Sequence, residues 1–343
     1  MYLRDEIAQQ PAVIERLFNE GQEATEAAAT AIRDFNPPFV CIAARGTSDH
    51  AAVYAQYLFG HALSLPVMLA TPSLHTVYKR PADLSQALVI GISQSGKAED
   101  VRAVLADARR GGALTLAITN FDDSPLAQAA ELHLPLRAER EFSVAATKTY
   151  TAQLTVIAML ASALADEQAR WDDLAAVPGL AREALEQSQP IADWAERYRY
   201  SGKLVTLGRG YNYATALEIS LKVKELTYIA SAGYSEADFR HGPIAVIDRG
   251  HPVILVAPQG PTLAGMVDMA KGLRERDAET LIISNDDDLL RAGTQALPIP
   301  AAPEWLSPII SVMPGQVYAM QQALARGYEV DKPRGLSKVT ITE

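Results

Sequence analysis

Short apolar runs alternate with longer, helix-periodic segments along the first half of the chain. Segment 97–110 is typical of the helical kind, because its apolar residues recur at helical spacing and it stops at Gly111 and Gly112. This alternation predicts an α/β fold whose parallel sheet is covered by helices on both faces. The expected strands of this half are Phe39–Ala44, Pro66–Ala70, Ala87–Ile92, Leu114–Thr119 and Leu132–Leu136.

The second half repeats this order of elements. An apolar helix is expected after each half, over Tyr150–Ala165 and Ile310–Ala325. The correspondence predicts two copies of one open α/β unit joined by a helical stretch, Trp171–Tyr198. The expected strands of the second copy are Lys203–Leu207, Pro252–Ala257, Thr280–Ser284 and Leu297–Pro300.

The same pattern predicts the domain organisation. A chain of 343 residues is long enough for two domains of ordinary size. An apolar patch at Val13, Ile14, Leu17 and Phe18 predicts an amino-terminal helix before the break at Pro37 and Pro38. The expected parts are a helical segment over 1–36, an α/β domain over 37–170, a helical connector over 171–199, a second α/β domain over 200–330 and a tail over 331–343.

Two of the expected strands end in small hydroxyl residues. Segments 42–50 (IAARGTSDH) and 89–96 (VIGISQSG) each run from an apolar strand into Gly, Ser and Thr. Backbone N–H groups and hydroxyls at the start of a helix favour an anion, so the pair predicts a phosphate-binding site. The alternative is that both are ordinary strand-to-helix loops, in which Ser and Thr are common helix caps.

Composition narrows the class of ligand and the compartment. The formal net charge of −10 argues against binding to nucleic acid or to an anionic membrane surface, so an anion must be held by local geometry. The single cysteine, Cys41, lies in an apolar run and is expected to be a buried structural thiol. Neither a secretory signal nor a membrane-spanning run is recognisable, and a cytoplasmic protein is expected.

Six segments in order carry a resemblance to a known family. They are RGTSDHAA (45–52), ISQSGKAED (92–100), SVAATKTYTAQL (143–154), LGRGYNYATALEISLKVKEL (207–226), FRHGPIAVID (239–248) and DKPRGLSKVTITE (331–343). Together they resemble the sugar isomerase (SIS) family and, within it, the isomerase half of the glutamine–fructose-6-phosphate amidotransferases. The resemblance implies two tandem SIS domains, each a doubly wound, flavodoxin-like parallel sheet. It also implies a homodimer with the active site near the subunit interface and a sugar phosphate as the small-molecule substrate.

The resemblance assigns ligand contacts to both hydroxyl-rich loops and to two further segments. One departure is Ala98, where the family often has Thr, so a hydroxyl donor is missing near the expected phosphate. The implied phosphate-binding residues are Ser48, Ser93, Gln94 and Ser95, and the implied sugar contacts are Thr47, Val144, Ala146 and Glu218.

Three charged residues share one face of an expected helix over 214–228. Glu218, Lys222 and Glu225 stand at i, i+4 and i+7, among mostly apolar neighbours. A solvated face with a Glu–Lys pair is one interpretation, and a buried functional cluster is the other. The resemblance makes Glu225 the base that moves a proton between C1 and C2 of an open-chain sugar phosphate, with Lys222 stabilising the developing negative charge.

Two further residues acquire roles only through the resemblance. His241, before Gly242 and Pro243, is expected on a turn and is implied to open the sugar ring, although a lone histidine is often structural. Lys338 lies near the end of the chain, where lysines are usually solvent-exposed, yet the resemblance implies a Schiff base with the open-chain ketose. The remaining histidines show no metal-ligand spacing, and no metal or redox cofactor is expected.

The expected reaction depends on the source of nitrogen. The chain begins with the isomerase-type region and shows no glutaminase cysteine at its start, so glutamine is not expected to be its nitrogen donor. Hydrolytic deamination of glucosamine 6-phosphate to fructose 6-phosphate and ammonia is therefore favoured. A fructosamine-6-phosphate deglycase and a plain phosphosugar isomerase are the enzymatic alternatives. A sugar-phosphate-sensing regulator is the alternative of another class.

Overall fold

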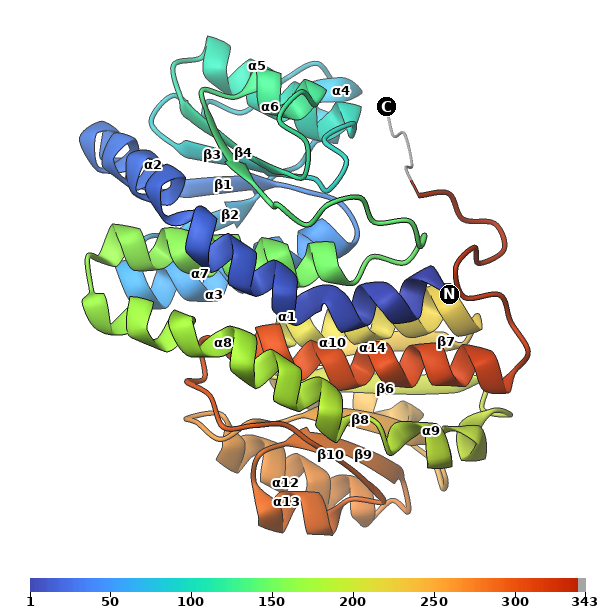
Figure 1. Ribbon diagram of the computed structural model, residues 1–343. Coiled ribbons are helices and arrows are strands. Elements are labelled where there is room, and N and C mark those ends of the chain that lie inside the picture. Colours follow the sequence, from blue (N-terminus) through green and yellow to red (C-terminus); the bar gives the residue numbers. More distant parts are fainter. Residues whose placement is uncertain (339–343) are drawn as a thin grey trace. The chain divides into compact units, whose positions relative to one another are not determined.

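The computed structural model describes residues 1–338, and these form two compact units, each with one five-stranded parallel sheet (Figure 1). The β1–β5 unit contains 12–141, 148–175 and the segment from Ser337. The β6–β10 unit contains Met1–Pro11, Phe142–Thr147 and Ala176–Leu336. Two helices, α1 (Tyr2–Glu20) and α8 (Gln168–Gln187), run from one unit into the other.

The sheet of the β1–β5 unit has the strand order β2-β1-β3-β4-β5, which is the flavodoxin-like order. Every neighbouring pair is parallel. Short apolar runs form these strands because both faces of the sheet are covered. The strands are β1 (Val40–Ala43), β2 (Val67–Leu69), β3 (Leu88–Ile92), β4 (Leu114–Thr119) and β5 (Leu132–Pro135).

Helices α3 and α7 pack together on one face of this sheet, and α5 lies on the other with α4 and α6 beside it (Figure 1). Cys41 and Val89 belong to the core cluster beneath α5. Cys41 is 1% exposed, which confirms the expected buried thiol, and this burial raises its pKa to about 11. The helices are α2 (Gln22–Phe35), α3 (Thr47–Leu63), α4 (Ser73–Thr76), α5 (Glu99–Arg110), α6 (Pro125–Ala129) and α7 (Lys148–Ala165).

The β6–β10 unit repeats this architecture. Its strand order is β10-β9-β8-β6-β7, the same order as in the first sheet when read from the other edge. Helix α10 packs on α14 and on strands β6 and β7, while α12 covers the core cluster of β6, β8 and β9. The strands are β6 (Lys203–Gly208), β7 (Ala230–Ser235), β8 (Pro252–Val256), β9 (Glu279–Ser284) and β10 (Gln295–Pro298).

Helices of two lengths surround the second sheet. The longer ones are α10 (Asn212–Thr227), α12 (Leu263–Arg274) and α14 (Ser307–Ala325). The shorter ones are α9 (Ile191–Trp194), α11 (Glu236–Arg240) and α13 (Asp287–Ala292), together with the 3₁₀ turns η1 (Ala195–Tyr198) and η2 (Pro243–Val246).

The predicted α/β fold with two doubly wound parallel sheets is confirmed, and two local expectations need correction. Strand β7 was not expected, because its sequence ASAGYS lacks the large apolar residues that mark the other strands. The amino-terminal helical segment is two helices, with Gly21 between them. A Cβ at Gly21 would collide with the carbonyl oxygen of Leu17, so only glycine fits where the two helices meet.

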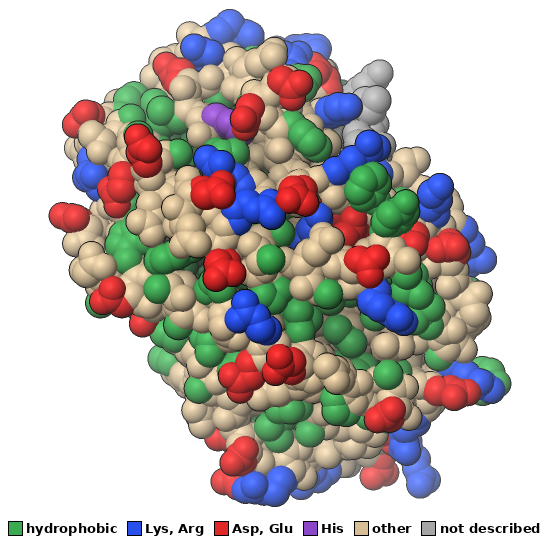
Figure 2. Space-filling view, in the orientation of Figure 1, with side chains coloured by type: hydrophobic (Ala, Val, Ile, Leu, Met, Phe, Trp, Pro, Cys, Tyr) green, Lys and Arg blue, Asp and Glu red, His purple; other side chains and the backbone are tan. Residues whose placement is uncertain are grey.

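Charges of both signs are interspersed over the face shown in Figure 2, with apolar side chains between them. Among the described residues, no helix is long and apolar enough to cross a bilayer.

Candidate active site

The two hydroxyl-rich loops follow neighbouring strands of the first sheet. Strands β1 and β3 pair in parallel, with Ala43 opposite Gly91, so their carboxyl ends lie at the same edge. The strand order reverses between β1 and β3, and doubly wound sheets bind ligands at this reversal. The structure therefore brings both predicted phosphate loops to the place where the fold favours a ligand.

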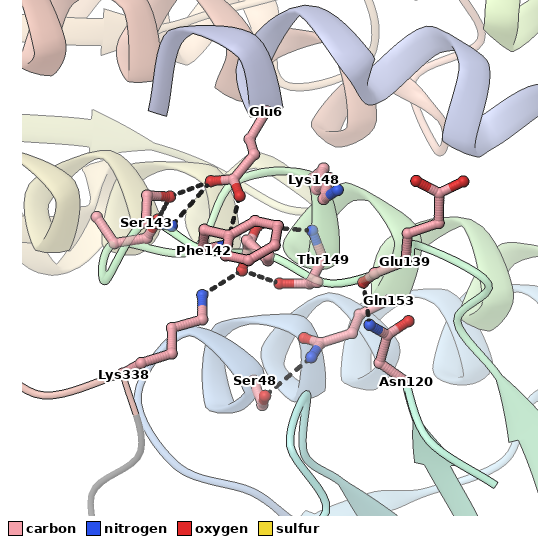
Figure 3. A network of polar contacts seen from close by, with 12 residues as sticks. Glu6, Ser48, Asn120, Glu139, Phe142, Ser143, Lys148, Thr149, Gln153 and Lys338 are labelled. Atoms are coloured by element: carbon pink, nitrogen blue, oxygen red, sulfur yellow. Dashed lines mark hydrogen bonds and ion pairs between the residues drawn. The ribbon is translucent and has the colours of Figure 1, made fainter. Parts of the chain in front are cut away.

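The first loop turns at Gly46, which has a positive φ of 55°, and leads into α3. Thr47 is the first residue of α3 and is partly exposed, whereas Ser48 is buried. Gln153 of α7 donates a hydrogen bond of 2.9 Å from Nε2 to the Ser48 hydroxyl (Figure 3). The proton of that hydroxyl remains available for a ligand, because a hydroxyl can accept and donate at once.

The second loop, Ser93–Ala98, joins β3 to α5 and is held by its own backbone. Its hydroxyls act as acceptors: Gly96 N donates to Ser93 Oγ at 3.2 Å and Lys97 N donates to Ser95 Oγ at 3.3 Å. The backbone nitrogen of Asn120 donates a hydrogen bond to the backbone carbonyl of Gln94 at 3.1 Å. Because the loop ends at the amino terminus of α5, the helix dipole favours an anion beside it.

An ion pair connects the first loop to α5. Arg45, in the first loop, donates from Nε to the Oδ2 atom of Asp100 at 2.7 Å, and Asp100 lies in the first turn of α5. The Asp100 side chain is only 1% exposed. Ala98, immediately before α5, supplies no side-chain cap, so the hydroxyl that the family often has there is absent from this site.

In the β6–β10 unit, α10 carries a compact charged cluster. The Lys222 ammonium lies 2.6 Å from Glu225 Oε2 and 3.3 Å from Glu218 Oε1. The Lys222 and Glu218 side chains are 1% and 0% exposed, and Glu225 is 22% exposed. The interpretation as a solvated face is therefore wrong. Two carboxylates share one ammonium, and Glu225 is the member that retains access to a ligand.

His241 ends α11 and lies on a turn, as expected. Its backbone N–H donates to the carbonyl of Asp238 at 3.0 Å, and Gly242 follows with a φ of 130°. The imidazole belongs to an exposed residue, which leaves it open to a ligand or to another chain.

Lys338 is anchored within the β1–β5 unit. Its Nζ atom lies 2.6 Å from Glu141 Oε2, and the Glu141 carboxylate is fully buried (Figure 3). Thr149 donates to the same carboxylate from its hydroxyl at 2.7 Å and from its backbone nitrogen at 3.2 Å. Lys338 is thus not a free terminal lysine, and an amine held this way can attack a carbonyl once its proton passes to an acceptor. Residues 339–343 of the expected tail lie outside the described residues.

The segment with Val144 and Ala146 is fixed by residues from both ends of the β6–β10 unit. The buried Glu6 of α1 accepts hydrogen bonds from the backbone N–H groups of Phe142 and Ser143 and from the Ser143 hydroxyl (Figure 3). The backbone nitrogen of Val144 donates to the carbonyl of Asp331 at 3.1 Å. We call this set of contacts the Glu6 clamp.

Sequence reasoning missed Glu6, Glu141 and Asp331. Glu6 gave one signal, because it stands with Gln10 on the face of α1 that Leu3 and Ile7 make apolar. An acidic residue on a buried face is typically hydrogen-bonded. The sequence has no comparable local signal for Glu141 or Asp331. Among residues 1–338, no group of three or more His, Cys, Asp or Glu side chains is placed to hold a metal ion.

Comparison with known proteins gives the family. The model of the SIS domain matches residues 38–163 and 198–326. The chain belongs to the SIS-domain family. The glutamine–fructose-6-phosphate aminotransferase (isomerizing) of Thermococcus kodakarensis is 34% identical over 352 residues, which cover 100% of this chain and 58% of that protein. The chain thus spans a little over half of the curated relative that it matches.

Solved structures agree with this assignment. A candidate phosphosugar isomerase from Silicibacter pomeroyi is 31% identical, with a TM-score of 0.85, over 96% of this chain and 99% of the other. Glucosamine-6-phosphate deaminase from Thermotoga maritima shares the fold, at 22% identity and a TM-score of 0.79 over 100% of both chains. Together the family and its members indicate an enzyme of the phosphosugar isomerase type.

Proposed function

We propose that this SIS-family protein deaminates glucosamine 6-phosphate, with water, to fructose 6-phosphate and ammonia. The observation that carries the proposal is the charged cluster on α10, where Glu225 keeps partial access to solvent beside two fully buried partners. A carboxylate in such surroundings suits proton transfer between adjacent carbons of a sugar. The homodimer and the cytoplasmic location remain expectations that rest on the resemblance and the composition.

In the proposed reaction the phosphate is bound by the loops that follow β1 and β3. Ser93 and Ser95 accept hydrogen bonds from the backbone, so each hydroxyl proton remains available to be donated to the phosphate. The amino terminus of α5 adds the favourable potential for a dianion. These contacts hold the sugar phosphate while its carbonyl end reacts.

The chemistry proceeds through the open-chain sugar. His241 is proposed to transfer the proton that opens the ring. Glu225 then moves the proton from C2 to C1, while a proton from the amine nitrogen passes to the C1 oxygen. The C1 aldehyde and C2 amine thereby become a C1 alcohol and a C2 imine. Lys222 balances the negative charge that develops in between.

Release of nitrogen completes the cycle. The Lys338 amine attacks the C2 imine and ammonia leaves, so the sugar becomes a lysine imine, which water hydrolyses to the ketone and the free amine. Glu141 and Thr149 hold Lys338 in a defined position for this step. The name of the Thermococcus kodakarensis relative describes an isomerizing aminotransferase of fructose 6-phosphate, which supports chemistry at both carbons and at nitrogen.

The test is ammonia release from glucosamine 6-phosphate, measured beside a panel of fructosamine phosphates and plain aldose phosphates. Glu225→Gln is expected to lower kcat by about 10²–10⁴-fold, the usual contribution of a general base. Binding of fructose 6-phosphate is expected to change less than about threefold, since the phosphate loops remain intact. Glu275→Gln, an exposed carboxylate at the end of α12, is the matched control.

Borohydride reduction with fructose 6-phosphate, followed by mass spectrometry, is expected to mark Lys338. An active Glu225→Gln variant would refute the proton-transfer assignment. Reduction without a sugar adduct on Lys338 would refute the imine step. Turnover of a fructosamine phosphate or of a plain sugar phosphate, without ammonia release from glucosamine 6-phosphate, would replace deamination by one of the other two reactions.

A further inference from the structure

A cavity opens on the β1–β5 unit, between α4, the loop that follows it and α5. Its volume is about 590 Å³, within the range of roughly 300–1,000 Å³ that is usual for small-molecule sites. None of the hydroxyl residues of the two phosphate loops lines it. The charged and histidine side chains in its wall are His75, Lys79, Glu99, Arg102, Asp107 and Arg110.

The wall of this cavity is cationic although the chain as a whole is acidic. Three cationic side chains against two carboxylates leave one net positive charge, whereas the whole chain carries −10. The ammonium of Lys79 has no hydrogen-bond or ion-pair partner within the described part of the chain, residues 1–338. A cation without a partner in a concave wall attracts anions from solution.

The two guanidinium groups keep donors in reserve. Arg102 gives its Nε and one Nη atom to Glu99, and Arg110 gives one Nη atom to Asp107. A guanidinium has five N–H donors, so both arginines can bind a further acceptor without breaking these pairs. Two arginines and a lysine form the donor set that best suits a phosphate group.

His75 fixes the floor of the cavity. Its ring is buried, and Nδ1 lies 2.8 Å from the Oδ2 atom of Asp107. Asp107 therefore contacts both His75 and Arg110, which joins α4 to the carboxyl-terminal turn of α5. The position of Arg110 in the wall is thus supported by Asp107, which is itself held by the buried His75.

We propose that this cavity binds a phosphorylated small molecule, at a site separate from the two loops assigned to the substrate phosphate. The volume leaves room for an organic group beside the phosphate. The inference rests on the cavity and its charges, and it stands whether or not the proposed deaminase reaction is correct.

The experiment first weakens phosphate binding at the loop between β3 and α5 and then measures ligand binding at the cavity. The full chain with Ser93→Ala and Ser95→Ala is titrated by calorimetry with inorganic phosphate, fructose 6-phosphate and uridine 5′-monophosphate. At least one organic phosphate is expected to bind with one-to-one stoichiometry. Adding Lys79→Ala and Arg110→Ala is expected to weaken that binding by about tenfold or more, because hydrogen bonds to charged groups are lost.

Arg80→Ala is the matched control, because it removes the same charge from the residue next to Lys79 but does not line the cavity. It is expected to leave affinity within about twofold. Lys79→Ala alone serves if the combined variant does not fold. The proposal is overturned if no organic phosphate binds the double serine variant, or if the affinity is the same with and without the cavity substitutions.

Discussion

Glu6→Gln tests whether the Glu6 clamp supports the site. The substitution keeps the shape of the side chain but replaces one carboxylate oxygen by an amide NH₂. Glu6 accepts three hydrogen bonds, from the N–H groups of Phe142 and Ser143 and from the Ser143 hydroxyl. At least one of these donors must therefore face another donor in the variant.

The magnitude follows from the burial of these groups. Glu6 is 2% exposed and Ser143 is 0% exposed, so water cannot replace the lost bond. A buried hydrogen bond to a charged group contributes about 1.5–3 kcal/mol to the free energy of unfolding. For domains of this size 1 kcal/mol corresponds to about 2–4 °C, so such a loss lowers Tm by about 3–12 °C. If about 1.4 kcal/mol of the lost hydrogen-bond energy raises the free energy of the catalytic transition state, kcat/KM falls about tenfold.

The assay combines thermal unfolding with steady-state kinetics, at a temperature well below the Tm of the variant. Asp5→Asn is the control, because Asp5 is the preceding residue of α1 and is exposed. Its side chain has no hydrogen-bond or ion-pair partner among residues 1–338. It makes the same change of charge, and both Tm and kcat/KM are expected to stay at the values of the unmodified protein.

The two readouts separate packing from positioning. A lower Tm with unchanged kcat/KM would show that the clamp stabilises the fold but does not position the segment with Val144 and Ala146 for catalysis. A variant with unchanged Tm and unchanged kinetics would refute the energetic argument altogether.

Two further predictions concern the phosphate loop and a buried histidine. Gly96→Ala places a methyl group against the Ser124 side chain, at a residue whose φ is 64°. The affinity for fructose 6-phosphate, measured by calorimetry, is therefore expected to fall about tenfold or more. Gly112→Ala is the control: its φ is 95° and its surroundings are open, so this affinity is expected to stay unchanged. Burial lowers the pKa of His251, so the unfolded chain takes up a proton first as pH falls below about 6.5 and stability declines. His251→Gln is expected to flatten the decline in Tm between about pH 7 and 5.5, and an unchanged slope would contradict this.

The fold and part of the site could be predicted because their signals are local. Strand runs such as 39–44 and the spacing of Glu218, Lys222 and Glu225 are patterns within a single element. Strand β7 was missed because it pairs with β6 alone at the edge of its sheet and is built of small residues.

The supporting contacts could not be predicted, because tertiary structure alone brings their partners together. Lys338 is 197 positions from Glu141, and Glu6 is 137 positions from Ser143. Neither pair has a spacing that a helix or a strand imposes. The chemical groups can be read from the sequence, but only the packed structure shows which of them form hydrogen bonds or ion pairs with one another.

Asp331 connects the start of α1 to the segment that precedes Lys338. Its carboxylate accepts hydrogen bonds from the backbone N–H groups of Tyr2 and Leu3, at 3.0 and 2.8 Å. Because the carboxylate lies at the amino terminus of α1, its negative charge also interacts favourably with the helix dipole, so one side chain holds the start of α1 to the segment that precedes Lys338.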